Sequence, residues 1–173
     1  MIFMSQSGLT DPGRAAEWDA WYIEHLHVML SVPAVSSAQR FFTDSPGYSP
    51  SLAMYTIPGP EVFTDPYYLS VRGMGEWSQF IDRRHYHRNL FAGLDRAPAV
   101  AANARLIVAD RDQEDAALAG VGLTWLTCAG IDRSTPLRGI AVLDAAAAEK
   151  LRAHDLAVYR PMTEQMVSEN QAK

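Results

Sequence analysis

The sequence has a single cysteine, no cluster of basic residues and no long apolar run. Because Cys128 is the one cysteine among 173 residues, the chain cannot form an internal disulfide. It lies in a strand-like run with no histidine near it in sequence, which favours a small buried apolar side chain over a nucleophile. A cytoplasmic setting is the expectation that follows.

The charge balance is mildly acidic. Lys and Arg together number 15 against 20 Asp and Glu, which gives a formal net charge of -5. Without a basic block the chain lacks the electrostatic footprint of nucleic-acid binding. No apolar run approaches the ~18 residues of a membrane span, and no basic-then-apolar leader is present. Neither nucleic acid, nor a membrane, nor secretion is therefore expected.

The composition supports a core of ordinary size, with 48% hydrophobic and 20% charged residues. The patterns predict strands at 1–7, 34–43, 51–57 and 105–110, and helices at 14–30 and 77–90. Asp11-Pro12 supplies the start of the first helix, and Pro33 requires it to end earlier. The resulting β-α-β-β-α-β order predicts an α+β fold, a ferredoxin-like sheet over residues 1–110.

Residues 111–173 are predicted to form a truncated second half packed on the first. Strands are expected at 121–129, 137–143 and 155–161, and a helix at 144–153 with Asp144 as its N-cap. This β-α-β extension contains no second copy of the aromatic and histidine-rich run WDAWYIEHLH at residues 18–27.

Three short motifs resemble those of a known superfamily. They are Trp18-x-x-Trp21-Tyr22-x-x-His25 with Glu24, then Val32-Pro33, then Ala38-x-Arg40-Phe41. The pattern is similar to that of the dimeric α/β-barrel superfamily, in its EthD-like branch, although Ala34 replaces the usual glycine. Over residues 1–110 the resemblance implies a sheet that packs against a second copy to close a barrel. It also implies a pocket between sheet and helices, with the helical Tyr and His pointing into it.

Tyr22 and His25 are the predicted catalytic pair. Three residues apart, they lie on one face of the helix, which Trp18 and Met29 extend. A near-neutral imidazole beside a phenol can exchange a proton with a substrate. The alternative is a core histidine that bonds a backbone carbonyl, with Tyr22 packed beside it.

A second cluster, DRRHYHR at residues 82–88, offers arginines for a carboxylate by bidentate contact. His85 and His87 point about 200° apart on a regular helix, so no metal site is predicted. Gly73 and Gly75 are candidate hinges of an aromatic loop at 63–77 that could close over a ligand. The residues predicted to bind substrate are Trp18, Arg40, Trp77, His85 and Arg88.

Together these features predict a cofactor-independent homodimeric enzyme of small-molecule catabolism. The expected reaction is acid/base isomerisation, or a related lyase step, on a conjugated carboxylic acid such as an aromatic ring-cleavage product. His25 would be the acid/base and Tyr22 its partner, and Arg40 or Arg88 would anchor the carboxylate. Two alternatives stay open: a non-catalytic ligand-binding or scaffold dimer, and a cofactor-free monooxygenase of the EthD-like type.

Overall fold

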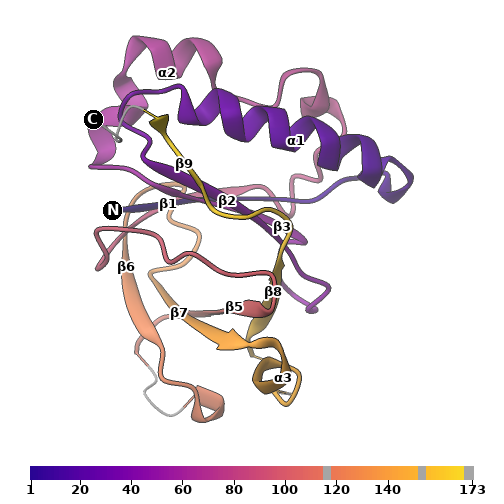
Figure 1. Cartoon of the computed structure of the whole chain (residues 1–173). Coiled ribbons are helices and arrows are strands. Elements are labelled where there is room, and N and C mark those ends of the chain that lie inside the picture. The colour runs from indigo at the N-terminus through magenta and orange to yellow at the C-terminus, as the bar shows by residue number, and fades with distance from the viewer. Residues whose placement is uncertain (115–117, 152–154, 170–173) are drawn as a thin grey trace.

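A computed structural model describes residues 1–114, 118–151 and 155–169 of the chain. At its centre is a closed antiparallel barrel of eight strands (Figure 1). The strands are β1 (Ile2–Ser7), β2 (Ser37–Phe42), β3 (Ser51–Thr56), β4 (His87–Ala92), β5 (Ala104–Arg111), β6 (Thr124–Ile131), β7 (Leu137–Asp144) and β8 (Ala157–Pro161). Their order is β3-β1-β4-β6-β7-β5-β8-β2, and β2 pairs with β3 to close the ring. A short β9 (Met166–Val167) adds to β2.

The predicted α+β fold, with a ferredoxin-like sheet closed by a second copy into a dimeric barrel, is wrong. The chain forms a mostly-β barrel that its own C-terminal half closes, where β6 pairs with β4 and β8 pairs with β2. β5 was expected to complete the first sheet, but it pairs with β7 and β8 instead. The two halves do repeat one strand order, β4-β1-β3-β2 and β8-β5-β7-β6.

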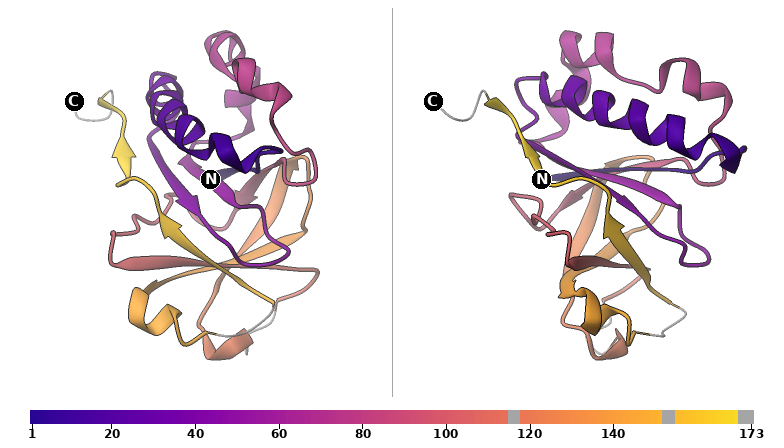
Figure 2. Two further views of the ribbon diagram at one scale, coloured as in Figure 1. Left: turned by 90° about the vertical axis from the view of Figure 1, so that its right-hand side faces the viewer. Right: turned by 45° about the vertical axis from the view of Figure 1, so that its right-hand side comes forward.

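The long helix α1 (Ala15–Leu30) covers the outer face of the first half of the barrel, beside α2 (Pro66–Val71) (Figure 2). It follows a 3₁₀ turn, Pro12–Arg14, whose Asp11 side chain accepts from the Gly13 N–H at 2.9 Å. Leu26 on its inner face is fully buried, which contributes about 2 kcal/mol by the usual transfer free energy. The start and end of this helix confirm the prediction from Asp11-Pro12 and Pro33.

The predicted helix 77–90 is wrong. Its residues form the 3₁₀ turn Gly75–Gln79 and then strand β4. Asn89 and Phe91 point into the barrel while Leu90 packs toward α1, so both faces of β4 are buried. A strand buried on both faces lacks polar–apolar alternation, which leaves no period-2 signal in the sequence.

In the second half, α3 (Ala145–Ala148) packs against β5 and β7 at the far end of the molecule from α1 (Figure 1). It is shorter than the helix predicted at 144–153, of which residues 152–154 lie outside the described part of the chain. The remaining 3₁₀ turns are Pro60–Thr64 and Leu118–Gly120. Among the described helices, none has the length and apolar character needed to cross a membrane.

A candidate site beneath the first helix

A cavity of about 260 Å³ lies between α1, α2 and the outer faces of β1, β3 and β4. Its wall contains four kinds of side chain that matter chemically: an imidazole, tyrosine hydroxyls, a serine and two guanidinium groups. The lining residues are Phe3, Ser5, His25, Met29, Tyr55, Tyr68, Arg72, Gly73, Met74, Tyr86 and Arg88. Of the residues predicted for the site, His25 and Arg88 line this cavity.

The imidazole of His25 is half-buried on α1. It stacks on Trp21, with ring centroids 4.7 Å apart and planes 12° from parallel. Burial lowers the pKa of His25 from 6.5 to about 4, because the charged form loses its water. The ring is therefore neutral at pH 7 and can accept a proton from a ligand.

Tyr22 stands one layer behind the cavity wall. Its side chain is fully buried, and its ring meets that of His25 edge-on at 5.7 Å between centroids. Burial raises the pKa of Tyr22 to about 12, although the positive charge of the nearby Arg40 acts in the opposite direction. The Tyr22 hydroxyl makes no hydrogen bond of good geometry to any described residue, although Ser5 and Tyr55 lie close enough to lower its pKa. At neutral pH this hydroxyl can donate a hydrogen bond but cannot act as a base.

The cations of the cavity are Arg88 from β4 and Arg72 at the C-terminal end of α2. Arg88 donates from NH2 to Asp132 Oδ1 at 3.3 Å, whereas its Nε is buried and has no hydrogen-bond partner among the described residues. Both arginines lower the pKa of Tyr68, although burial raises it overall. The two guanidinium groups therefore give the cavity wall a positive charge that favours an anion.

The other predicted residues of the first cluster lie outside the lining. Trp18 and Trp77 are buried in the core, with their rings 5.1 Å apart between centroids. Arg40 is 3% exposed and pairs with Asp19 at 2.6 Å, while its guanidinium lies over the Tyr22 ring at 4.4 Å. Because these contacts occupy Arg40, it supports the wall behind Tyr22 and leaves the anchoring of a ligand to Arg88.

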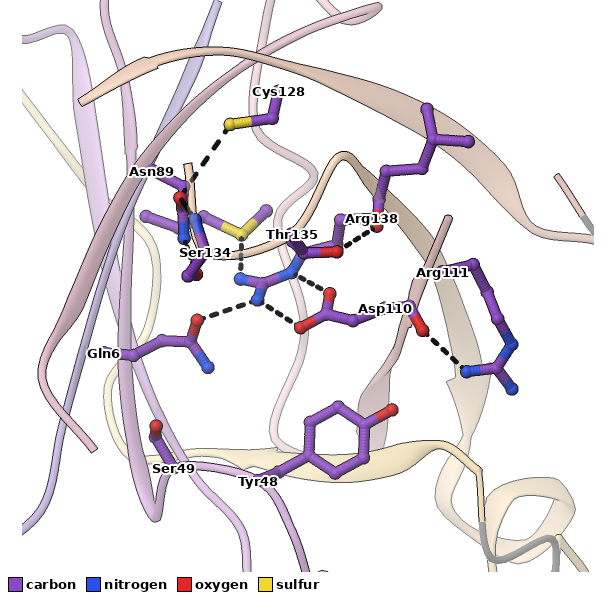
Figure 3. Close-up of polar contacts among 12 residues, drawn as sticks. Gln6, Tyr48, Ser49, Asn89, Asp110, Arg111, Cys128, Ser134, Thr135 and Arg138 are labelled. Carbon is purple, nitrogen blue, oxygen red and sulfur yellow. Dashed lines mark hydrogen bonds and ion pairs between the residues drawn. The ribbon is translucent and has the colours of Figure 1, made fainter. Parts of the chain in front are cut away.

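His85 and His87 line a different cavity, of about 480 Å³, at one mouth of the barrel. Asp110, which lines this cavity, pairs with the fully buried Arg138, which donates from Nε and NH2 to the two carboxylate oxygens of Asp110 at 2.7 Å each (Figure 3). Arg138 NH2 also donates to Gln6 Oε1 at 2.7 Å. This cluster is saturated by its own partners, so the cavity beneath α1, whose wall contains the His25 imidazole and two guanidinium groups, is the stronger candidate for a site.

Metal-binding chemistry has no visible basis in the described part of the chain, where no three His, Cys, Asp or Glu side chains come close enough to hold an ion. Comparison with protein families, with curated proteins and with solved structures found no match for the chain. The resemblance to EthD-like proteins therefore stays a prediction.

Sequence reasoning missed the residues that strands and the β6–β7 turn bring to the site. Ser5 and Tyr55 face the cavity from β1 and β3, which pair antiparallel. Phe3 and Ser5 are two residues apart and therefore lie on the same face of β1, which could have indicated that this outer face is partly polar. Asp132 comes from the second half of the barrel, and no local pattern indicates that it meets Arg88.

Proposed function

We propose that the cavity beneath α1 binds a small carboxylic acid and catalyses its acid/base isomerisation or a related lyase step. The observation that carries the proposal is a neutral imidazole, His25, in the same cavity wall as a cation with a free donor, Arg88. A carboxylate would pair with the Arg88 guanidinium through charge-assisted hydrogen bonds. It would also place the rest of the ligand beneath the imidazole.

Each polar group then has a role in moving one proton. His25 takes a proton from a carbon beside the conjugated system and returns it to another carbon of the same system. Hydroxyls of Ser5 and Tyr55 donate hydrogen bonds to the oxygen on which negative charge develops. The bound carboxylate raises the pKa of His25 toward neutrality, because an anion nearby favours the imidazolium.

The size of the cavity limits the ligand. A cavity of ~150 Å³ in another protein is large enough for benzene, so about 260 Å³ accommodates one ring or a short conjugated chain with its carboxylate. Phe3 and Met29 supply the apolar part of the wall. A single-ring or conjugated dienoic acid fits both the volume and the charges.

A non-catalytic ligand-binding protein is the second candidate. It is favoured by the pKa of His25, about 4 in the free protein, which makes the imidazole a weak base unless the ligand raises that pKa. In this case the same groups hold the acid without moving a proton. A cytoplasmic setting, in keeping with the single cysteine, and a homodimer are both predictions that we retain.

The deciding experiment measures turnover of a panel of conjugated dienoic and 2-oxo acids, beside thermal melting, for the wild type and His25→Gln. If His25 transfers the proton, the variant should lose ~10²–10⁴ in rate with little change in melting temperature. If the wild type binds these acids and turns over none of them, the binding protein is the correct assignment. If it binds none, the carboxylic-acid site itself is wrong.

A further inference from the structure

The turn between β6 and β7 lies against β4 of the first half, whose Arg88 lines the cavity. Asp132 in this turn accepts the Arg88 backbone N–H at Oδ2, at 2.8 Å, and receives Arg88 NH2 at Oδ1, at 3.3 Å. The Asp132 backbone N–H returns a hydrogen bond to the Arg88 carbonyl at 2.9 Å. Asp132 therefore holds Arg88 through hydrogen bonds to both the main chain and the side chain of Arg88.

The backbone of this turn is strained. Ile131 has φ of 66° and Arg133 has φ of 50°, in the left-handed region that non-glycine residues rarely adopt. For a β-branched residue such as Ile131 this conformation is a clear outlier. Strain of this kind persists where surrounding contacts over-determine the backbone, and it gathers at functional sites.

Those surrounding contacts come from the opposite face of β4. Inside the barrel, Asn89 donates to Ser134 Oγ at 2.7 Å and accepts from the Ser134 N–H at 2.9 Å. The pairing of β4 with β6 also shifts register between Leu90 and Phe91. Such irregularities redirect side chains beside active sites. The turn is therefore held from both faces of β4 while Asp132 reaches the outer one.

We propose that Asp132 is a positioning residue, which fixes Arg88 so that its guanidinium stays in the cavity wall and receives the ligand carboxylate. The part of the inference that concerns the ligand carboxylate rests on the proposed function. The part that concerns how Asp132 holds Arg88 does not. Asp132 accepts from Arg88 NH2, and no described group accepts from Arg88 Nε, so the contacts within the chain leave part of the guanidinium unsatisfied. An arginine fixed in this way loses less side-chain entropy when it binds a ligand.

Two variants separate positioning from simple charge pairing. Asp132→Asn keeps an acceptor for the Arg88 N–H and removes the negative charge. Arg133→Gly relieves the left-handed backbone, which glycine adopts readily, and leaves Asp132 and Arg88 in place. It also removes the hydrogen bond from the Arg133 side chain to the Ala129 carbonyl, at 3.0 Å. Glu17→Gln is the matched control, since it removes the carboxylate from the 2.6 Å ion pair with Arg14, whose residues do not line the cavity.

The first measurement follows the Arg88 Nε–H signal by NMR, assigned with Arg88→Lys. We expect a resolved signal that exchanges slowly with water in the wild type and in Glu17→Gln. Exchange should be faster in Asp132→Asn. It should stay slow in Arg133→Gly, because glycine accepts the left-handed conformation and the contacts between Asp132 and Arg88 remain. An Arg88 signal that keeps its protection in Asp132→Asn would overturn the proposal.

The second measurement titrates benzoate, with benzyl alcohol as its uncharged counterpart. Benzoate should bind Asp132→Asn roughly five- to tenfold more weakly, the scale of coupling within one hydrogen-bond network, while benzyl alcohol binding stays unchanged. Tighter benzoate binding would mean that Asp132 only neutralises Arg88, and would overturn the positioning role. If benzoate and the other acids leave the wild-type Arg88 signal unmoved, the proposed function fails, whereas the loss of protection in Asp132→Asn still supports the role of Asp132 in holding Arg88.

Discussion

His25 couples the chemistry of the cavity to the stability of the fold. Its pKa is about 4 in the folded chain and 6.5 when exposed, so between these values the unfolded chain binds more protons. Stability therefore rises with pH across this window and falls as the pH drops through it. Taking the pH from 7 to 5 should remove about 2 kcal/mol of unfolding free energy through this one group.

His25→Gln isolates that contribution, because the other histidines remain in both proteins. Urea unfolding at pH 7 and pH 5 should show that the variant loses about 2 kcal/mol less than the wild type between the two values. Equal losses in the two proteins would mean that the His25 imidazole is not shielded from water. With benzoate bound, the loss between pH 7 and pH 5 should be smaller, because the anion raises the folded-state pKa of His25 toward its unfolded value of 6.5.

Tyr22 and Tyr159 provide a matched pair of buried phenols. The Tyr22 hydroxyl has no hydrogen bond of good geometry, whereas the Tyr159 hydroxyl donates to the Ser49 carbonyl at 2.7 Å. Tyr22→Phe should therefore leave the unfolding free energy unchanged or raise it by about 1 kcal/mol, and Tyr159→Phe should lower it by about 1 kcal/mol. Thermal or urea unfolding of the two variants checks this. A clear loss in Tyr22→Phe would show that Ser5 or Tyr55 does bond the hydroxyl.

Among single residues, the sequence predicted some that line the cavity, but it did not reveal where the side chains of others would point. His25 could be found because helical spacing places it beside Tyr22 and Trp18. Arg40 was predicted to bind the ligand, but it pairs with Asp19 on α1. No motif in the sequence indicates this ion pair. Long charged side chains choose among several partners in space, and that choice depends on packing of the whole fold.

Among the elements, the segment between α2 and β4 contains two glycines in the left-handed region. Gly73 has φ of 105° and Gly75 has φ of 51°, and Gly73 lines the cavity. An added Cβ at Gly73 would meet nothing within 4 Å, so a substitution there tests the backbone alone. The sequence marked both glycines as hinge candidates of a loop, and the hinge stays a prediction.

Gly73→Ala should lower the unfolding free energy by about 1 kcal/mol, the cost of a left-handed conformation for a residue with a Cβ. Gly122→Ala is the control, because its Cβ would also meet nothing within 4 Å and its φ is not in the positive range. The control should retain wild-type stability. Equal melting temperatures for the two variants would indicate that Gly73 changes conformation freely.

The same region explains why the second helix was mispredicted. Residues 77–90 contain apolar side chains at spacings that a helix would accept, such as Trp77, Phe80 and Ile81. The chain instead makes one 3₁₀ turn and then enters the barrel as β4. Pairing with β1 on one side and β6 on the other decides the conformation. Long-range strand pairing overrides local propensity here, and one sequence does not reveal the partner strand.

For the whole molecule, the hydrophobic pattern located seven of the eight barrel strands to within a few residues. The predicted sheet lacked a cover for its inner face, and a second copy was invoked to supply it. The structure covers that face with β5, β6, β7 and β8 of the same chain, whose apolar side chains fill the barrel with those of β1 to β4. Closure removes the exposed edges that an open sheet would leave for a partner.

Because the barrel closes within one chain, its stability should not depend on protein concentration. A barrel completed by two chains would melt at a temperature that rises with protein concentration, because association stabilises the folded state. A barrel closed within one chain should melt at the same temperature from about 1 to about 100 micromolar. Light scattering on the same samples measures the mass against 19.1 kDa for one chain. A dimer with a constant melting temperature would retain the predicted homodimer as an association of complete barrels. A melting temperature that climbs with concentration would mean that neither barrel is complete without its partner.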